Sequence, residues 1–185
     1  MNTKNDQDII EKAKLIKLVV FDVDGVFTDG SLYYHDDGQE TKAFNTQDGQ
    51  GVKMLHQQGI ETAIITGRTS NIVKHRAQNL GVLRLVQGRE DKLVALNEIL
   101  SGMNLTPDQV AYAGDDLPDL PAICYAGLGI AVANAHSFVA LHADWQTSLP
   151  GGNGAVREIC DFILDAKGLL SDMQNKYLTL ADTSK

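Results

Sequence analysis

The chain has 185 residues, which is enough for one domain with a complete hydrophobic core but short for two domains. Its composition, 43% hydrophobic and 22% charged residues, is that of an ordinary globular protein. The formal net charge of −8 argues against a broad nucleic-acid or anionic-membrane surface, so cations that contact an anionic ligand must be placed locally.

The sequence also excludes several targeting and metal classes. The polar N-terminal segment has no apolar stretch of signal-peptide length, and no apolar run approaches the roughly 20 residues of a membrane span. Cys124 and Cys160 lie far apart and outside any CxxC pattern, so we expect reduced thiols in a cytoplasmic protein. The five histidines form neither HxH nor HExxH, which argues against a zinc site.

The first elements are a helix, a buried strand and a hairpin. Residues 6–14 are typical of a short helix, and residues 15–21 form a β-branched, apolar run typical of a strand buried on both faces. Residues 31–45 alternate imperfectly about Asp36-Asp37-Gly38, which predicts a β-hairpin. The hairpin is the one element outside the later alternation, so we expect it to project from the sheet.

The rest of the chain alternates helices with strands, which predicts an α/β fold with a parallel sheet covered on both faces. No repeat or linker divides it, so we expect a single domain over residues 1–185. The expected helices are 51–59, 69–81, 90–101, a short turn at 106–109, 117–127 and one that starts near Gly154. The expected strands are 60–66, 83–87, 110–114, 128–132 and 143–147.

Polar residues gather where the expected strands end. Asp22 and Asp24 follow the first strand, Thr66 ends the second, Asp115 follows the strand at 110–114, and Lys92 lies in the first turn of a helix. In a parallel sheet, ligands bind in the crevice beyond the carboxyl ends of the strands. The sequence therefore predicts that these residues converge at one edge of the sheet.

Clustered carboxylates in such a crevice need a cation, because like charges repel and would otherwise retain a proton. Carboxylate oxygens suit Mg²⁺, which binds one or two carboxylates together with water and substrate phosphate. We expect oxygens of Asp22 and Asp115 on the ion, and Asp24, on the same side of the strand, within reach of the same ligand. Taken singly, these acids are also compatible with caps of turns and helices; taken with Thr66 and Lys92, they favour a common site.

Four ordered motifs carry a family resemblance. DVDGVFTDG, TGR, Lys92 and GDDLPD resemble the four motifs of the haloacid dehalogenase (HAD) superfamily, in order and after the right elements. KAFNTQDGQG, AIITGR and GGNGAVRE are similar to its 3-deoxy-D-manno-octulosonate 8-phosphate (KDO-8-phosphate) phosphatases, over residues 15–168. The resemblance implies a three-layer, Rossmann-like fold with a hairpin in place of a large cap, while the tail at 169–185 carries no matching motif.

The resemblance also implies a mechanism. Asp22 would be the nucleophile that forms an aspartyl-phosphate, and Asp24 the acid and then the base. Thr66 and Lys92 would bind the transferring phosphoryl group, while Asp22, Asp24 and Asp115 hold Mg²⁺. Asp116 and Asp119 are equally compatible with orienting metal-bound water and with capping the helix.

The implied substrate is a phosphorylated sugar acid, KDO-8-phosphate, used to make lipopolysaccharide sugar. Its carboxylate needs further cations, and Arg68 and Arg76, eight residues apart, lie near one face of a helix. Solvated surface cations are the alternative for Arg68, Arg76 and Lys53. The implied substrate-binding residues are Asp24, Asn45, Thr46, Gln47, Asp48, Gly49, Lys53, Gly67, Arg68, Arg76 and Lys92.

The resemblance further implies a homotetramer with active sites at subunit contacts. An isolated hairpin is marginal in water, so pairing between copies would cover its edges; a monomer with a mobile hairpin is the alternative. Three other functions stay open: a phosphatase of another sugar acid such as a nonulosonate 9-phosphate, a phospho-receiver module, and a non-catalytic scaffold. A HAD phosphomutase is disfavoured, because no large cap is present to retain an intermediate.

Overall fold

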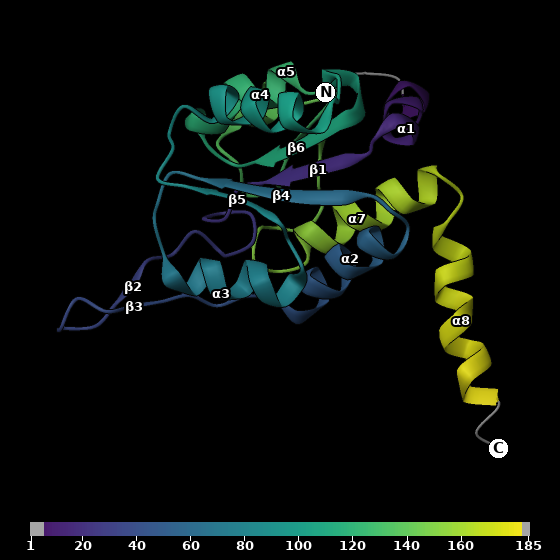
Figure 1. Ribbon diagram of the computed structural model, residues 1–185, viewed down its shortest axis with the longest axis horizontal. Coiled ribbons are helices and arrows are strands. Elements are labelled where there is room, and N and C mark those ends of the chain that lie inside the picture. The colour runs from purple at the N-terminus through teal and green to yellow at the C-terminus, as the bar shows by residue number, and fades with distance from the viewer. Residues whose placement is uncertain (1–5, 183–185) are drawn as a thin grey trace.

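The computed structural model describes residues 6–182, in which a six-stranded sheet separates two groups of helices (Figure 1). All five pairings between neighbouring strands are parallel. The predicted α/β fold is therefore confirmed. The strand order across the sheet is β5 (Arg84–Gln87), β4 (Glu61–Thr66), β1 (Leu18–Phe21), β6 (Val110–Gly114), β7 (Leu128–Ala131) and β8 (Trp145–Gln146).

The central strand β1 contributes side chains to two hydrophobic cores, because successive side chains of a strand point to opposite faces of the sheet. Val19 and Phe21 pack into one core, and Leu18 and Val20 into the other. The first core is shared with α1 (Asp6–Leu15), α2 (Thr46–Gln57), α3 (Asn71–Leu80) and α7 (Ala155–Ala166). The second is shared with α4 (Lys92–Met103), α5 (Leu120–Tyr125) and α6 (Ser137–His142).

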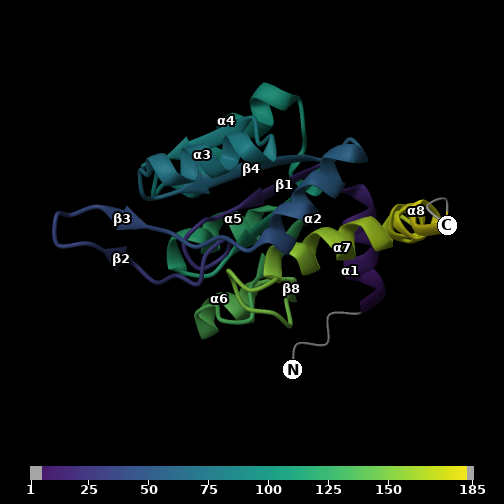
Figure 2. The ribbon, with the colours of Figure 1, turned by 90° about the horizontal axis from the view of Figure 1, so that it is seen from below.

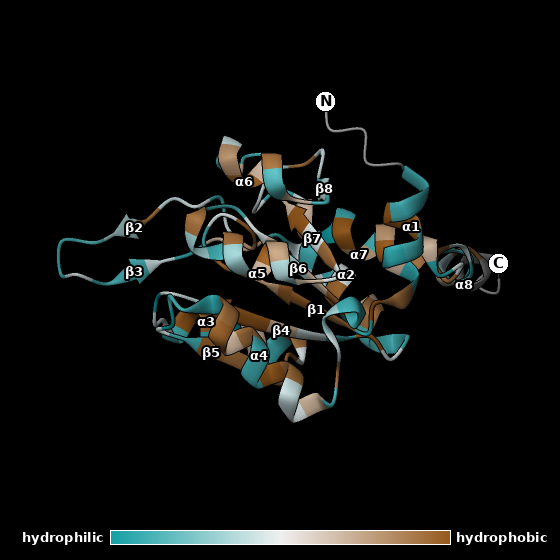
Figure 3. Ribbon diagram, turned by 90° about the horizontal axis from the view of Figure 1, so that it is seen from above, coloured by the Kyte–Doolittle hydropathy of each residue, from teal (hydrophilic) through white to brown (hydrophobic). Residues whose placement is uncertain are grey.

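The expected hairpin is present and projects from the body, as predicted (Figures 1 and 2). Its strands, β2 (Tyr33–Tyr34) and β3 (Glu40–Thr41), form a separate two-stranded antiparallel sheet. Figure 3 shows that the hairpin is mostly hydrophilic, whereas the strands of the main sheet are apolar. The tyrosines of β2 and the preceding Leu32 are exposed nonetheless.

Four helical regions differ from the sequence-based expectation. The helix expected at 51–59 begins at Thr46, because the Asn45 side chain accepts a hydrogen bond from the Gln47 amide (2.7 Å) and caps it. The helix expected at 117–127 is divided into a 3₁₀ turn (Leu117–Asp119) and α5. Helix α6 and the C-terminal helix α8 (Leu170–Asp182) were not predicted.

Helix α8 extends away from the body of the molecule (Figure 1). Near its start, Met173 is buried, and further along Gln50 Nε2 donates to the Tyr177 hydroxyl at 3.0 Å. Across residues 6–182, none of the helices has the length and apolar character to cross a membrane.

Candidate active site

The candidate site lies at the point in the sheet where the order in which the chain adds strands reverses. From β1 the chain passes through the hairpin and α2 to β4 on one side, and later reaches β6 on the other side of β1. Such a switch point opens a crevice at the carboxyl ends of the strands. Asp22 follows β1, Thr66 ends β4 and Asp115 follows β6, so the predicted convergence is present.

A cleft of about 170 Å³ lies at this edge. That is smaller than the roughly 300–1,000 Å³ typical of pockets for drug-sized ligands, so the cleft suits a phosphoryl group with the rest of a substrate outside. Its lining residues are Asp22, Asp24, Thr66, Gly67, Arg68, Glu90, Lys92 and Pro118.

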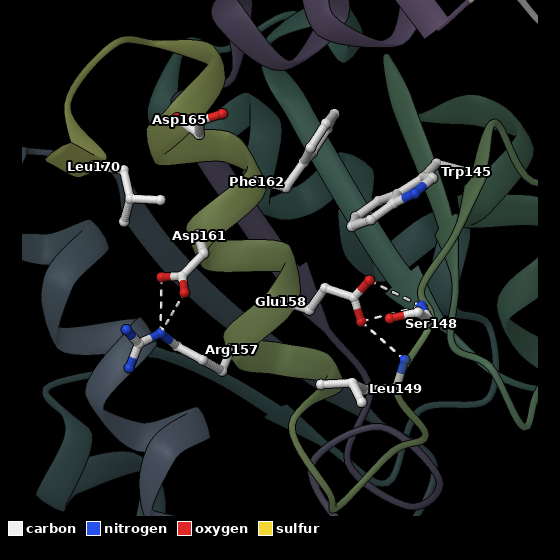
Figure 4. Close-up of a pocket in the computed structure, with 9 residues that line it drawn as sticks. All are labelled: Trp145, Ser148, Leu149, Arg157, Glu158, Asp161, Phe162, Asp165 and Leu170. Atoms are coloured by element: carbon white, nitrogen blue, oxygen red, sulfur yellow. Dashed lines mark hydrogen bonds and ion pairs between the residues drawn. The ribbon is translucent and has the colours of Figure 1, made fainter.

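A larger hollow of about 510 Å³ lies along α7 and shares no lining residue with this cleft (Figure 4). Its lining includes the rings of Trp145 and Phe162, whose centroids are 4.5 Å apart and whose planes are tilted by 31°. Glu158 accepts hydrogen bonds from the amides of Ser148 and Leu149. Because that carboxylate already stabilises the loop before α7, size alone does not make this hollow a reaction site.

Lys92 is the cation at the floor of the cleft. It is 4% exposed, and its Nζ lies 2.6 Å from Asp119 Oδ1 and 3.1 Å from Asp22 Oδ1. Burial lowers the pKa of Lys92, but the charges of Asp22 and Asp119 outweigh it, so the pKa lies above its usual value. Lys92 is therefore positively charged at neutral pH.

Asp119 is a fully buried anchor for Lys92 and the neighbouring loop. Its Oδ1 also accepts from the Tyr112 hydroxyl (2.9 Å), and its Oδ2 accepts from the Asp115 amide (3.2 Å). Asp116 instead accepts from the Leu117 amide (2.8 Å) and caps the 3₁₀ turn. Of the two roles left open for these acids, Asp116 has the geometry of a cap.

The positive charge near the carboxyl groups of Asp22 and Asp115 is too small to offset their burial and the nearby negative charge. Burial, followed by the charge of Asp119, raises the pKa of Asp22 to about 8 and that of Asp115 to about 7. Lys92 Nζ is close enough to Asp22 Oδ1 for an ion pair but not aligned as a hydrogen bond, so that oxygen has no hydrogen-bond donor among the described residues.

These carboxylates fit a divalent cation. One oxygen from each of Asp22, Asp115 and Asp119 lies within 4.8 Å of the others. Asp119 is already occupied by Lys92, Tyr112 and backbone amides, which leaves Asp22 and Asp115 as the side chains with oxygens to offer. An oxygen-only set of this kind suits Mg²⁺.

Thr66 and Arg68 form the opposite wall. Thr66 is 2% exposed, and its hydroxyl oxygen accepts from the Arg68 amide at 3.4 Å. The hydroxyl proton stays available to an oxygen of a ligand in the cleft. Arg68 Nη2 donates hydrogen bonds to the Tyr34 hydroxyl (2.5 Å) and to Glu40 Oε1 (3.2 Å), both in the hairpin.

Asp24 faces two cations, one of which the sequence did not single out. Its Oδ1 is hydrogen-bonded by Lys42 Nζ, and its Oδ2 lies 3.9 Å from Arg68 Nε. Lys42 stands in the KAFNTQDGQG segment, but no pattern there signals that its side chain returns to the end of β1. A contribution of Asp24 to the metal site stays a prediction, because its carboxylate is not in the three-acid cluster.

The predicted substrate residues of α2 and α3 lie outside the lining of the cleft. Asp48 is fully buried and accepts from the Arg157 amide at the start of α7 (2.9 Å). Gly49 packs against Arg76, whose Nη2 donates to the Asn45 carbonyl (3.0 Å). Three further predicted residues, Thr46, Gln47 and Lys53, are exposed on α2.

Comparison with known proteins shows which family this chain matches. Residues 71–159 match the family model of haloacid dehalogenase-like hydrolases. The 3-deoxy-D-manno-octulosonate 8-phosphate phosphatase of Escherichia coli (strain K12) is 44% identical over 91% of this chain and 90% of its own length.

Two solved structures of such phosphatases are similar throughout. The enzyme from Moraxella catarrhalis, in complex with magnesium, phosphate and KDO, gives a TM-score of 0.92 at 44% identity, covering 94% of this chain and 99% of that one. The enzyme from Yersinia pestis gives a TM-score of 0.87 at 47% identity, covering 89% of each chain.

Proposed function

The chain belongs to the 3-deoxy-D-manno-octulosonate 8-phosphate phosphatases, a group of haloacid dehalogenase-like hydrolases, and we propose that it hydrolyses KDO-8-phosphate to KDO and phosphate with Mg²⁺. The observation that carries this proposal is the joint placement of Asp22, Thr66 and Lys92 in one cleft, beside Asp115. This arrangement is suited to phosphoryl transfer, which depends mostly on positioning and on charge stabilisation.

Asp22 and Asp115 are the residues that we propose to hold Mg²⁺. The unpaired Asp22 oxygen and the raised pKa values of both carboxyl groups support this assignment. When bound, the ion neutralises the carboxylates and the developing charge on the phosphoryl oxygens.

In the first step, a carboxylate oxygen of Asp22 attacks phosphorus in line and the bond from phosphorus to the sugar oxygen breaks. Asp24 gives a proton to that departing oxygen, so the sugar acid leaves as an alcohol. Lys92 and the Thr66 hydroxyl donate hydrogen bonds to the transferring phosphoryl oxygens. The product of this step is an aspartyl-phosphate on Asp22.

In the second step, Asp24, now a carboxylate, accepts a proton from the water molecule that attacks the aspartyl-phosphate. The bond from phosphorus to the Asp22 oxygen breaks, which releases phosphate and restores the Asp22 carboxylate. Asp24 is again protonated, so protons balance over the cycle.

The substrate contacts are assigned in two groups. Gly67 and Arg68 line the cleft, and we propose that they contact the substrate beside the phosphoryl group. Contact with the sugar stays a prediction for the residues outside the lining, which are Asn45, Thr46, Gln47, Asp48, Gly49, Lys53 and Arg76. For Asp48, the buried hydrogen bond from the Arg157 amide favours a structural role instead.

We also propose that the chain forms a homotetramer and acts in the cytoplasm. The hairpin's unpaired strand edges and its exposed Leu32, Tyr33 and Tyr34 support association between copies. Both cysteines are free, as is usual in a reducing compartment. Sedimentation of the wild type against Tyr33→Lys tests the assembly: we expect a tetramer that dissociates in the variant, and a wild-type monomer would contradict it.

The test of function is phosphate release from KDO-8-phosphate and from a nonulosonate 9-phosphate, each with Mg²⁺ or with a chelator. We expect Mg²⁺-dependent turnover with a kcat/KM for KDO-8-phosphate at least about tenfold higher. Preference for the nine-carbon substrate would keep the chemistry and overturn the substrate. A phosphoprotein that persists without releasing phosphate would favour the phospho-receiver function instead.

A further inference from the structure

Lys42 is a buried cation directly behind the catalytic acid. Its side chain is 1% exposed, and its Nζ contacts Asp24 Oδ1 and lies 3.2 Å from Glu40 Oε1. Burying an ammonium group is costly unless it is paired, so this placement needs its two acidic partners. Lys42 is absent from the lining of the cleft, so it reaches Asp24 from the hairpin side.

The two oxygens of Asp24 have different surroundings. Oδ1 accepts from the Lys42 ammonium, which has three donors and no acceptor, so an oxygen facing it can only accept. Oδ2 is directed toward Arg68 Nε, 3.9 Å away, a residue that lines the cleft. Oδ2 is therefore the oxygen that faces a substrate.

The hairpin fixes both cations. Glu40 Oε1 lies 3.2 Å from Lys42 Nζ and also 3.2 Å from Arg68 Nη2. The Tyr34 hydroxyl accepts from the same Arg68 nitrogen. The projecting hairpin (Figure 2) is thus linked to Asp24 within one chain, through Lys42 and Arg68, which both lie between the carboxylates of Glu40 and Asp24.

We propose that Lys42 is a positioning residue for the phosphatase reaction: it holds Asp24 Oδ1 so that Oδ2 faces the departing sugar oxygen. The inference rests on the proposed function, because it requires Asp24 to protonate the leaving group. Lys42 touches neither substrate nor metal in this assignment and acts through Asp24 alone.

A defect in leaving-group protonation has a signature that general damage lacks. A sugar alkoxide is a poor leaving group and needs a proton as it departs, whereas 4-nitrophenolate leaves without one. General acid catalysis contributes about 10²–10⁴-fold, and a misplaced catalytic group alone costs about 10²-fold. A displaced Asp24 should therefore slow the sugar phosphate far more than the aryl phosphate.

The experiment compares kcat/KM for KDO-8-phosphate and for 4-nitrophenyl phosphate, since this parameter covers the steps through phosphoryl transfer to Asp22. For Lys42→Met we expect a fall of about 100-fold on KDO-8-phosphate and of about threefold or less on the aryl phosphate. Lys42→Arg keeps a cation at this position and should recover at least about tenfold of the loss on KDO-8-phosphate.

Lys14→Met is the matched control, because Lys14 also pairs with a carboxylate, Glu11 (2.7 Å), but does so in solvent on α1. It should leave both values unchanged. Melting temperatures show whether each variant is folded; should Lys42→Met not fold, Lys42→Gln, which removes the charge but keeps a polar end on the side chain, is compared on the same two substrates and should show the same selective loss.

An equal loss on both substrates, or no loss on either, would overturn the role of Lys42. Wild-type protein that fails to hydrolyse KDO-8-phosphate would instead overturn the proposed function, so the two failures are distinguished by the wild-type measurement alone.

Discussion

The Asp115 carboxylate occupies the space that a side chain at residue 25 would need. A Cβ on Gly25 would stand 2.1 Å from Asp115 Oδ2, and Gly25 has a φ of +96°. The DxDG sequence thus serves the site twice. Its acids provide Asp22 and Asp24, and its glycine admits the carboxylate that follows β6.

Gly25→Ala should weaken Mg²⁺ binding, because the added methyl group displaces Asp115 from Asp22. We expect the Mg²⁺ dissociation constant, measured by calorimetric titration, to rise at least about tenfold, which corresponds to about 1.4 kcal/mol. Gly59→Ala is the control: Gly59 also has a positive φ (+72°), but a Cβ there meets nothing within 4 Å. Both variants carry about 1–2 kcal/mol of backbone strain, and only Gly25→Ala should lose metal. Equal Mg²⁺ affinity in the two variants would contradict this account.

Asp22→Asn should abolish turnover while it stabilises the metal-free protein. The pKa of about 8 shows that burial disfavours the Asp22 carboxylate, and an amide removes that charge. At pH 8 in a chelator, we expect the melting temperature to rise by a few degrees. The exposed Asp36→Asn should leave it unchanged. A lower melting temperature for Asp22→Asn would show that the charge of Asp22 stabilises the fold.

The metal-free protein should lose stability as pH rises. The pKa values of Asp22 and Asp115 in the folded state, about 8 and about 7, lie above the value near 3.9 of an unfolded Asp. The folded state therefore holds these protons more tightly, and the free energy of unfolding falls between about pH 4 and pH 8.

Mg²⁺ should reverse this trend, because it binds the deprotonated carboxylates. Denaturant titrations at pH 5.5 and pH 8, with Mg²⁺ and with a chelator, measure both effects. We expect the gain from Mg²⁺ to be larger at pH 8. A gain that is larger at pH 5.5 would contradict the assignment of these two carboxylates to the metal.

Substitutions at Asp48 distinguish a structural role of this residue from contact with the substrate. Its carboxylate is buried and accepts the Arg157 amide, and burial raises its pKa. Asp48→Asn keeps an acceptor there and should leave KM for KDO-8-phosphate within about twofold, whereas Asp48→Ala should destabilise the protein by about 1–3 kcal/mol. A strongly raised KM in a stable Asp48→Asn variant would support the predicted contact with substrate.

The sequence was sufficient for the elements whose signals are local. The buried strand before Asp22, the capping box at Thr106 and Gln109, and the acids at the strand ends all depend on neighbours in sequence. The parallel order then brought Asp22, Thr66 and Lys92 together without further information.

The missed features depend on contacts between distant residues. Lys42 reaches Asp24, 18 positions earlier, only because the hairpin folds back over the end of β1. Asp48 is buried because α2 packs on α7, which makes it an anchor for a helix that starts more than 100 residues later. Neither pairing leaves a pattern in the local sequence.

The most direct test of the central claim, that Asp22 carries the phosphoryl group and Asp24 then activates water, is a trapping measurement. Asp24→Asn protein is mixed with Mg²⁺ and ³²P-labelled 4-nitrophenyl phosphate, which needs no proton donor to transfer its phosphoryl group. We expect an alkali-labile label that approaches one per chain on the peptide containing Asp22, and no label on protein that carries Asp22→Asn in addition to Asp24→Asn. Label on another residue, or none while wild-type protein releases phosphate from the same substrate, would contradict the account.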